Sequence, residues 1–473
     1  MRRAGVRRAL DRWFAAPAPF LTARWLWLRS LGLIFFSVFY SLWFQIHGLI
    51  GPTGILPARD YLLYAQQAVG DRAYWLIPSL LWIDASHAAL TTLVVAGLIA
   101  SITLTLNVFT RTSIAIAGLC HLSFVAAAQD FSGYQSDGML LEAALLSLFV
   151  AGKGPPTRAA VFLLQWEWFR IYFESGVVKI LSGEEQWRHL TAMDKYYENG
   201  PLPTRFAWHV QQWPHSFHAT TAAITLIAEL LLVWLLFVPS RRVRLALFAL
   251  TAALQIGIIL TANYAFLNYL VLALGFFLIH DREVVPINDR SVASIERPIR
   301  RAEVVVLPAI FILSIVIFFA RGSLAARFID PFRVVNNYGL FAVMTRERYE
   351  IEFQGTSDGR LWIAYPFRYK PQIPTRPPRF FAPYQPRFDW NLWFASLGTA
   401  SQNPWVMATQ ERLLANDRDV LRLFAANPFP HAPPRAVRVM LWQYWFTTRQ
   451  ERARSGAWWN RRLIGEYAPM AVR

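Results

Sequence analysis

The chain has 473 residues, with 47 Lys and Arg against 30 Asp and Glu, so its formal net charge is +17. It is 55% hydrophobic and only 16% charged, whereas a soluble domain is typically about a quarter charged. This composition excludes a disordered chain and a lone soluble enzyme, and it favours a protein embedded in a membrane. The single cysteine, Cys120, excludes an intramolecular disulfide, a CxxC redox motif and a cysteine-based zinc cluster.

The N-terminal segment, residues 1–24, is rich in arginine and precedes an apolar run at about 25–46. A membrane span needs roughly 20 apolar residues, whereas the hydrophobic region of a cleaved signal peptide is shorter. We therefore predict a basic cytoplasmic N-terminus followed by an uncleaved signal anchor.

Eight further apolar runs lie at about 86–108, 112–128, 137–152, 159–181, 219–238, 243–261, 264–280 and 303–320. The amphipathic stretch 60–83 is expected to be interfacial or re-entrant. Residues 25–320 thus predict an α-helical polytopic membrane protein with about nine transmembrane helices. Lys and Arg gather in alternate loops, so the positive-inside rule places the N-terminus in the cytoplasm and everything after the last run outside.

The tail, residues 321–473, has no run long enough to span a membrane and carries 22 Lys and Arg against 11 Asp and Glu. Alternation over 348–355, a Ser-Asp-Gly turn and a second run at 361–369 predict a β-hairpin. Helices are predicted near 388–397, 404–426 and 433–450. This is a C-terminal extramembrane α+β domain, whose basic face meets either lipid headgroups or an acidic partner, and no nucleic-acid-binding motif is present.

Ionisable residues interrupt the span at 159–181. Glu167, Arg170 and Glu174 share one helix face, which predicts an internal ion-pair ladder. Lys179 lies on another side near the outer end. It either extends to the interface or acts as a desolvated base or anion contact, and the sequence leaves both open.

Four motifs on the predicted outer side contribute further polar residues. Together with Lys179, the candidate outer-face site comprises Asp137, Glu142, Asp194, Asn263 and Asn268. Helix capping at Asp137 and turn capping at the two asparagines are the structural alternatives. No histidine set has metal-ligand spacing, and no catalytic or nucleotide-binding motif occurs. We therefore assign no metal, no cofactor and no catalytic residue beyond the candidate Lys179.

Long motifs in both halves of the chain resemble the lipase maturation factor family. They are YQSDGMLLEA at 134–143, GVVKILSGEEQW at 176–187, LTAMDKYYENGPLP at 190–203, TANYAFLN at 261–268, NNYGLFAVMTRERYEIEFQGTSDG at 336–359, PYQPRFDWNLWFAS at 383–396 and NPFP at 427–430. The resemblance runs from about Gly51 to Ala468. It implies a compact multi-pass membrane protein, without a long C-terminal extension, that assists folding and assembly of secreted lipases and turns its C-terminal region to the lumen.

A fainter resemblance links Gly176 to Trp187 with the membrane region of the vitamin K-dependent γ-carboxylases. In that family a lysine in a comparable setting acts as the catalytic base, and here Lys179 matches it. The match covers a short stretch, and Val178 stands where that family has a second lysine.

Three functions follow. The first is a membrane chaperone for a secreted lipase or another exported client, with Tyr384, Asp389, Trp390 and Trp393 as candidate client contacts. For these aromatics, a place in the domain core is the alternative. The second is an intramembrane enzyme that uses Lys179 as base on a lipophilic cofactor or substrate. The third is a transporter or passive scaffold, and the lack of inverted repeats argues against transport.

The compartment depends on the organism. We expect the endoplasmic reticulum membrane in a eukaryote and the inner membrane in a bacterium, with the tail lumenal or periplasmic.

Overall fold

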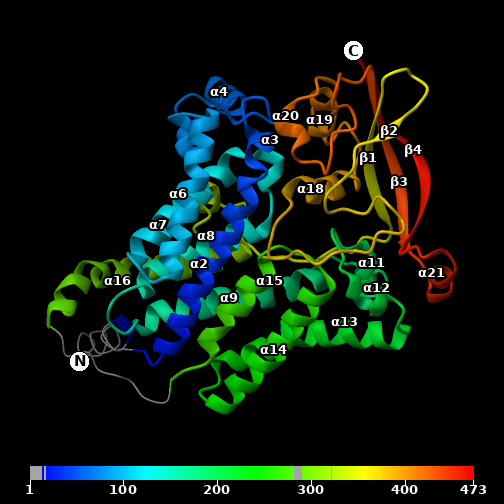
Figure 1. The fold of residues 1–473 in the computed structure, drawn as a ribbon. Coiled ribbons are helices and arrows are strands. Elements are labelled where there is room, and N and C mark those ends of the chain that lie inside the picture. The colour runs from blue at the N-terminus through cyan, green and yellow to red at the C-terminus, as the bar shows by residue number, and fades with distance from the viewer. Residues whose placement is uncertain (1–12, 15–17, 282–289, 321) are drawn as a thin grey trace.

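The computed structural model describes residues 13–14, 18–281, 290–320 and 322–473. The arginines at positions 2, 3, 7, 8 and 12, on which the basic N-terminus was predicted, lie outside these residues. Figure 1 shows a bundle of helices beside a smaller domain that contains a sheet.

Each of the nine apolar runs forms a helix. The helices are α2 (Leu21–Trp43), α6 (His87–Thr105), α7 (Thr110–Ala127), α8 (Gln135–Val150), α9 (Arg158–Leu181), α13 (His215–Leu230, continued by η4, Leu232–Phe237), α14 (Arg241–Thr261), α15 (Leu267–Leu274, continued by η5, Gly275–Leu278) and α16 (Arg290–Phe319). Within the described residues, six are long and apolar enough to cross a membrane: α2, α6, α7, α13 with η4, α14 and α16. The number nine is thus not confirmed, because α8 and α15 are short and α9 carries several charges.

Loops that were predicted to be cytoplasmic meet at one end of the bundle. The amide of Leu21 donates to Asp281 Oδ2 at 2.7 Å, and Arg24 donates to the carbonyl of Gly152 at 2.9 Å. Thr157 Oγ1 donates to Glu303 Oε2 at 2.8 Å. Three starting points therefore lie on one side, as alternating spans require: those of α2, of α9 and of the apolar part of α16.

The opposite end carries short helices. The stretch 58–83 forms α4 (Ala58–Val69), α5 (Arg72–Leu76) and η2 (Leu80–Trp82), and none of these is a candidate span. Tyr64 and Ile83 in this stretch are 71% and 85% exposed, as expected at a lipid–water interface. The other short elements are α3 (Ile46–Ile50), η3 (Gln129–Ser132), α10 (Glu185–Arg188), α11 (Tyr196–Asn199), α12 (Arg205–Gln211), α17 (Leu324–Ile329) and η6 (Asp330–Phe332).

The C-terminal domain is an antiparallel sheet covered on one side by helices. The strand order is β2 (Ile363–Ala364), β1 (Arg348–Thr356), β3 (Ala436–Phe446) and β4 (Trp459–Val472). Helices α18 (Arg387–Ala395) and α19 (Pro404–Leu414) pack on the sheet, and α20 (Arg418–Leu421) packs on α3 of the bundle. The remaining helix, α21 (Arg449–Ser455), connects β3 and β4. Figure 1 shows α18, α19 and α20 between the sheet and the helical bundle.

Two predictions for this domain need correction. The predicted hairpin is reduced to two pairs, Gln354 with Ala364 and Gly355 with Ile363, because Pro366 soon ends β2. The predicted helix at 433–450 is wrong, since 436–446 forms the central strand β3. Both faces of β3 are partly buried, so its apolar residues do not alternate strictly and imitate helical spacing.

Candidate functional site

An irregular segment enters the bundle between α8 and α9. We call residues 334–345 the inserted segment. Its backbone amides donate to side chains of the bundle: Asn336 to Glu142 Oε2 at 2.9 Å, Tyr338 to Glu174 Oε2 at 2.8 Å, Gly339 to Gln135 Oε1 at 3.0 Å and Leu340 to Ser175 Oγ at 3.3 Å. Irregular backbone at membrane depth is tolerated where protein side chains satisfy it. The polar residues of α8 and α9 therefore serve to hold this segment.

Arg170 is the centre of that arrangement. Its guanidinium donates to Glu142 Oε1 at 2.7 Å and to Glu174 Oε1 at 2.9 Å, and also to the carbonyl of Asn336. Tyr338 Oη donates to Glu142 Oε2 at 2.7 Å. All these side chains are buried, so two carboxylates and one guanidinium neutralise each other in part while fixing the segment.

The predicted ion-pair ladder is confirmed for Arg170 and Glu174 but not for Glu167. Both carboxyl oxygens of Glu167 are buried and have no hydrogen-bond partner among the described residues. Arg170 turns instead to Glu142, which lies 28 residues earlier in the chain. Gly138, one turn before Glu142, makes room for the segment, because a Cβ there would collide with the side chain of Asn336.

Asp137 joins the bundle to the outer domain. Its carboxylate accepts two hydrogen bonds from Arg387 of α18, at 2.7 and 2.8 Å, and His121 Nε2 lies 3.3 Å away. Arg387 also donates to the carbonyl of Phe131 at 2.8 Å. The capping alternative for Asp137 is wrong, since the cap residue of α8 is Tyr134 and no side chain caps the helix. A bidentate pair of this kind fixes orientation as well as distance.

Lys179 forms a second buried ion pair. Its ammonium donates to both oxygens of Glu229 on α13, at 2.8 and 2.9 Å, and to the carbonyl of Leu340 at 2.9 Å. Only 1% of its side chain is exposed. Of the two alternatives for Lys179, extension to the interface is therefore wrong. All three of its donors are used, which leaves it no free proton donor for an anion.

This ion pair lies in the wall of a cavity of about 370 Å³ between α9, α13, α14 and α15. Asn268 lines the same cavity and donates to Gln255 Oε1 at 2.6 Å, and Gln255 in turn donates to Tyr172 Oη at 2.8 Å. Among the six candidate outer-face residues, Lys179 and Asn268 thus share this cavity.

The other predicted outer-face residues lie elsewhere. Asp194 contacts His215 Nδ1 at 2.9 Å in an exposed loop. Asn263 ties the turn before α15 to the outer domain: its amide donates to the carbonyl of Arg379, and its Oδ1 accepts from the amides of Phe381 and Ala382 at 2.9 and 3.0 Å. Asp137 binds Arg387, and Glu142 binds the inserted segment. The six residues thus do not form one cluster.

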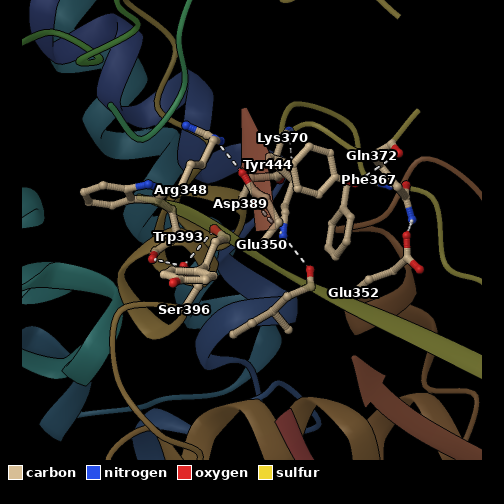
Figure 2. A network of polar contacts seen from close by, with 12 residues as sticks. Arg348, Glu350, Glu352, Phe367, Lys370, Gln372, Asp389, Trp393, Ser396 and Tyr444 are labelled. Atoms are coloured by element: carbon tan, nitrogen blue, oxygen red, sulfur yellow. Dashed lines mark hydrogen bonds and ion pairs between the residues drawn. The ribbon is translucent and has the colours of Figure 1, made fainter. Parts of the chain in front are cut away.

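A further polar network fills the outer domain between β1 and α18 (Figure 2). Glu350 accepts from Arg348 at 2.5 Å and pairs with Lys370 at 2.8 Å. Arg348 also donates to the carbonyls of Glu198 and Pro201, at 3.0 and 2.8 Å, in the loop between α9 and α13. Through Arg348, the polar face of β1 joins the sheet to the bundle.

Asp389 is buried in this network, with 2% of the residue exposed. Its Oδ1 accepts from the amides of Tyr369 and Lys370, each at 3.2 Å. Burial raises the pKa of Asp389 to about 6, although those two amides and the nearby Lys370 favour the ionised carboxylate. Asp389 therefore orders the turn at 369–370.

The aromatic candidates divide between the interior and a groove. Trp390 and Trp393 are 6% and 7% exposed. Tyr384 is half-buried and lines, with Asp389, an open groove of about 720 Å³ between the outer end of α2 and the outer domain. On the bundle side, this groove is lined by Tyr40, Trp43 and Phe44, which are 46%, 46% and 51% exposed.

The raised pKa of Asp389 makes a testable prediction about pH. The carboxyl binds its proton more tightly in the folded state than the ordinary value of 3.8, so its stabilising contribution is complete below about pH 4 and is lost as the pH rises through about 6. Asp389→Asn keeps the Oδ1 acceptor and cannot ionise. Above pH 6 we expect the variant to exceed the wild type in free energy of unfolding by up to about 3 kcal/mol, at 1.36 kcal/mol per pKa unit.

The measurement is detergent-solubilised unfolding of both proteins from pH 4 to pH 8. Asp330→Asn, at a side chain that is 64% exposed, is the control and should change the free energy of unfolding by less than about 0.5 kcal/mol. Parallel pH curves for Asp389→Asn and the wild type contradict the prediction.

Sequence reasoning missed the partners of the charged residues it identified. Glu229 lies within a predicted span, and Arg387 follows the Pro-rich stretch of the tail. An intramembrane charge calls for an opposite partner, so Glu229 was available as a candidate for Lys179. Arg387 has no comparable local signal, because only the docking of the two domains brings it to Asp137.

Comparison with known proteins matches both halves of the chain to models of one family. The lipase maturation factor transmembrane domain matches residues 22–286, and the lipase maturation factor C-terminal domain matches residues 334–469. Lipase maturation factor 1 of Bos taurus is 31% identical over 94% of this chain and 88% of its own length, and the Homo sapiens protein of that name is 30% identical over 93% and 86%. Lipase maturation factor 2 of Gallus gallus is 29% identical over 94% of the chain and 81% of its own. No solved structure matches the chain.

Proposed function

Because the chain belongs to the lipase maturation factor family, we propose that this multi-pass membrane protein assists the folding, assembly and maturation of secreted lipases or other exported proteins. In this proposal, residues 25–320 anchor the protein in the bilayer, and residues 321–473 meet the client outside. Holding a client needs no catalytic group and no cofactor.

The observation that carries the proposal is the groove between the outer end of α2 and the outer domain. It brings Tyr384 and Asp389 next to exposed aromatics of the membrane helix, and Arg368 and Arg422 lie on its outer-domain side. Aromatic and arginine side chains are enriched at protein-binding surfaces. Aromatic rings bury a large area at a low cost in conformational entropy. An incompletely folded lipase exposes apolar segments that fit such a groove.

Two buried arginines of the outer domain connect it to the bundle, one through an ion pair and one through backbone carbonyls. Arg387 binds Asp137, and Arg348 binds the loop before α13, so the outer domain is fixed to the bundle at separate points. A rigid groove requires less ordering when the client binds. Direct client contact is then proposed for Tyr384, whereas Asp389, Trp390 and Trp393 support the wall from the interior.

The finer location is also part of the proposal. Alternating basic loops support a cytoplasmic N-terminus and a groove that faces the lumen of the endoplasmic reticulum, or the periplasm of a bacterium. A secreted client passes through that compartment, which supports this orientation.

The enzyme alternative is less well supported. The matched family models and the relatives described above are lipase maturation factors, so the carboxylase resemblance gains no support from them. Lys179 donates all three of its hydrogen bonds to Glu229 and Leu340. A base needs access to a substrate proton, and this lysine is engaged elsewhere.

Photocrosslinking tests the groove. A photoreactive amino acid at Trp43 is expected to capture a co-expressed secreted lipase from the same host, whereas the same residue at Trp25 is not. Trp25 and Trp43 lie at opposite ends of α2 and are 53% and 46% exposed, so they are matched in exposure and helix. Tyr384→Ala should reduce the Trp43 crosslink and the yield of active lipase, each by about tenfold, which corresponds to about 1.4 kcal/mol of client affinity.

The control for Tyr384→Ala is Tyr64→Ala, which removes an exposed tyrosine of α4 that does not line the groove. Equal capture at Trp25 and Trp43, or an undiminished lipase yield from Tyr384→Ala, rules out the groove as the client site.

A further inference from the structure

The cavity beside Lys179 is independent of the client groove and has the composition of an apolar ligand site. Its volume of about 370 Å³ lies within the range of roughly 300–1,000 Å³ that small-molecule sites occupy. Side chains such as Ile171, Leu254, Ile258 and Val271 make most of the lining apolar. The residues of α13 that line the cavity extend from Phe217 to Glu229. This separation of twelve residues is about 18 Å of helix at 1.5 Å per residue.

The polar groups in the lining require nothing from a ligand. Lys179 is satisfied by Glu229 and Leu340, and Asn268, Gln255 and Tyr172 form a hydrogen-bonded chain. No polar side chain that lines this cavity is among the buried groups without a partner in the described residues. A charged or strongly polar ligand would therefore lose its hydration without compensation, whereas a hydrocarbon chain would not.

The cavity opens sideways between α13 and α14. Helix α13 packs on α9 and α14 packs on α15; the two have little contact with each other along α13, and they meet at η4, which packs on α14. They are also among the least buried candidate spans, with 33% and 17% of their apolar windows buried. Ile224 of α13 and Leu260 of α14 line the cavity and are 51% and 43% exposed. The opening therefore faces the hydrocarbon of the bilayer rather than water.

We propose that this cavity binds one long hydrocarbon chain that enters from the bilayer between α13 and α14, with its polar end group at the outer membrane surface near α12. The chain contacts Leu340, Phe341 and Met344 of the inserted segment, so its binding favours the docked position of the outer domain. A membrane phospholipid and a free fatty acid offer the same chain chemistry.

The test uses the full-length protein in vesicles that contain a trace of photoreactive lipid. One preparation carries a phospholipid with a diazirine in the middle of one acyl chain, and a second carries a free fatty acid with the same group. We expect labelling at Ile224, Ala253 and Leu260 to exceed, by about tenfold, the labelling at Ile99 and Ile116, a difference of about 1.4 kcal/mol. Ile99 and Ile116 are exposed residues of α6 and α7 that report ordinary lipid contact.

A blocking variant tests the cavity itself. Gly257 of α14 lines the cavity, and a Cβ there would meet nothing within 4 Å, so Gly257→Trp fills the space without a backbone clash. It should reduce the labelling of Ile224 to that of Ile99. Gly118→Trp on α7 is the matched control, because its Cβ also meets nothing within 4 Å. Ala253→Trp is a second blocking variant, should Gly257→Trp not fold.

Labelling by either probe supports the site and identifies whether a phospholipid or a free acid is the source of the chain. Labelling at Ile224 equal to that at Ile99 for both probes, or labelling unchanged by a folded blocking variant, overturns the proposal. Neither outcome depends on lipase maturation, so the client proposal stands or falls separately.

Discussion

Replacing Arg170 with methionine is expected to detach the inserted segment from the membrane helices and to lower the free energy of unfolding by about 3–5 kcal/mol. The substitution removes the guanidinium that lies between Glu142 and Glu174, and it leaves both carboxylates buried without their cation. It also removes a donor to the carbonyl of Asn336. The segment loses the charge that holds it in place, so the outer domain should loosen with it.

Hydrogen exchange measures this directly. The amides of Asn336 and Tyr338 donate to Glu142 and Glu174 in the wild type, and they should exchange much faster in Arg170→Met. Arg158→Met is the control, because Arg158 is an exposed residue at the start of the same helix. Unchanged exchange at Asn336 and Tyr338 in a folded Arg170→Met protein contradicts the assigned role.

Lys179→Met is expected to be nearly as damaging, and a second substitution at Glu229 should reverse most of the loss. Removing one partner of a buried ion pair costs about 3–5 kcal/mol, whereas replacing both with apolar side chains of similar volume is often neutral. The double variant Lys179→Met with Glu229→Leu should therefore recover both the free energy of unfolding and lipase maturation. Lys195→Met, in a pair whose lysine is 54% exposed, is the control and should cost less than about 1 kcal/mol.

This double variant also separates structure from chemistry. If Lys179 acts as a catalytic base, the double variant folds but has no activity, because the base is still missing. If the pair is structural, stability and activity return together. A stable but inactive double variant would thus refute the structural assignment and revive the enzyme alternative.

Several features of the protein follow from local sequence. Each of the nine apolar runs is helical, because hydrophobic length and composition act within a single segment. Strand β1 and helices α18 and α19 also lie close to their predicted positions. The family was recognisable from long motifs, several of which now have a physical role: Asp137, Glu142 and Asn336 stand in them and bind each other or the outer domain.

The spacing of apolar residues along the sequence does not always identify the secondary structure, as strand β3 shows. Its residues show helical spacing because both faces of the strand are partly covered, and only pairing with β1 and β4 identifies them as a strand. The span count has the same limit. Charges in α9 keep this helix out of the candidate spans, and Glu142, which compensates Arg170, lies on another helix.

The sequence by itself determined the class of protein, its family and which intramembrane charges needed explanation. The tertiary structure decided what those charges do. Lys179 pairs with Glu229 across 50 residues, and Asp137 pairs with Arg387 across 250. Helical periodicity relates residues a few positions apart, so it cannot predict contacts between elements that meet only when the bundle and the outer domain pack together.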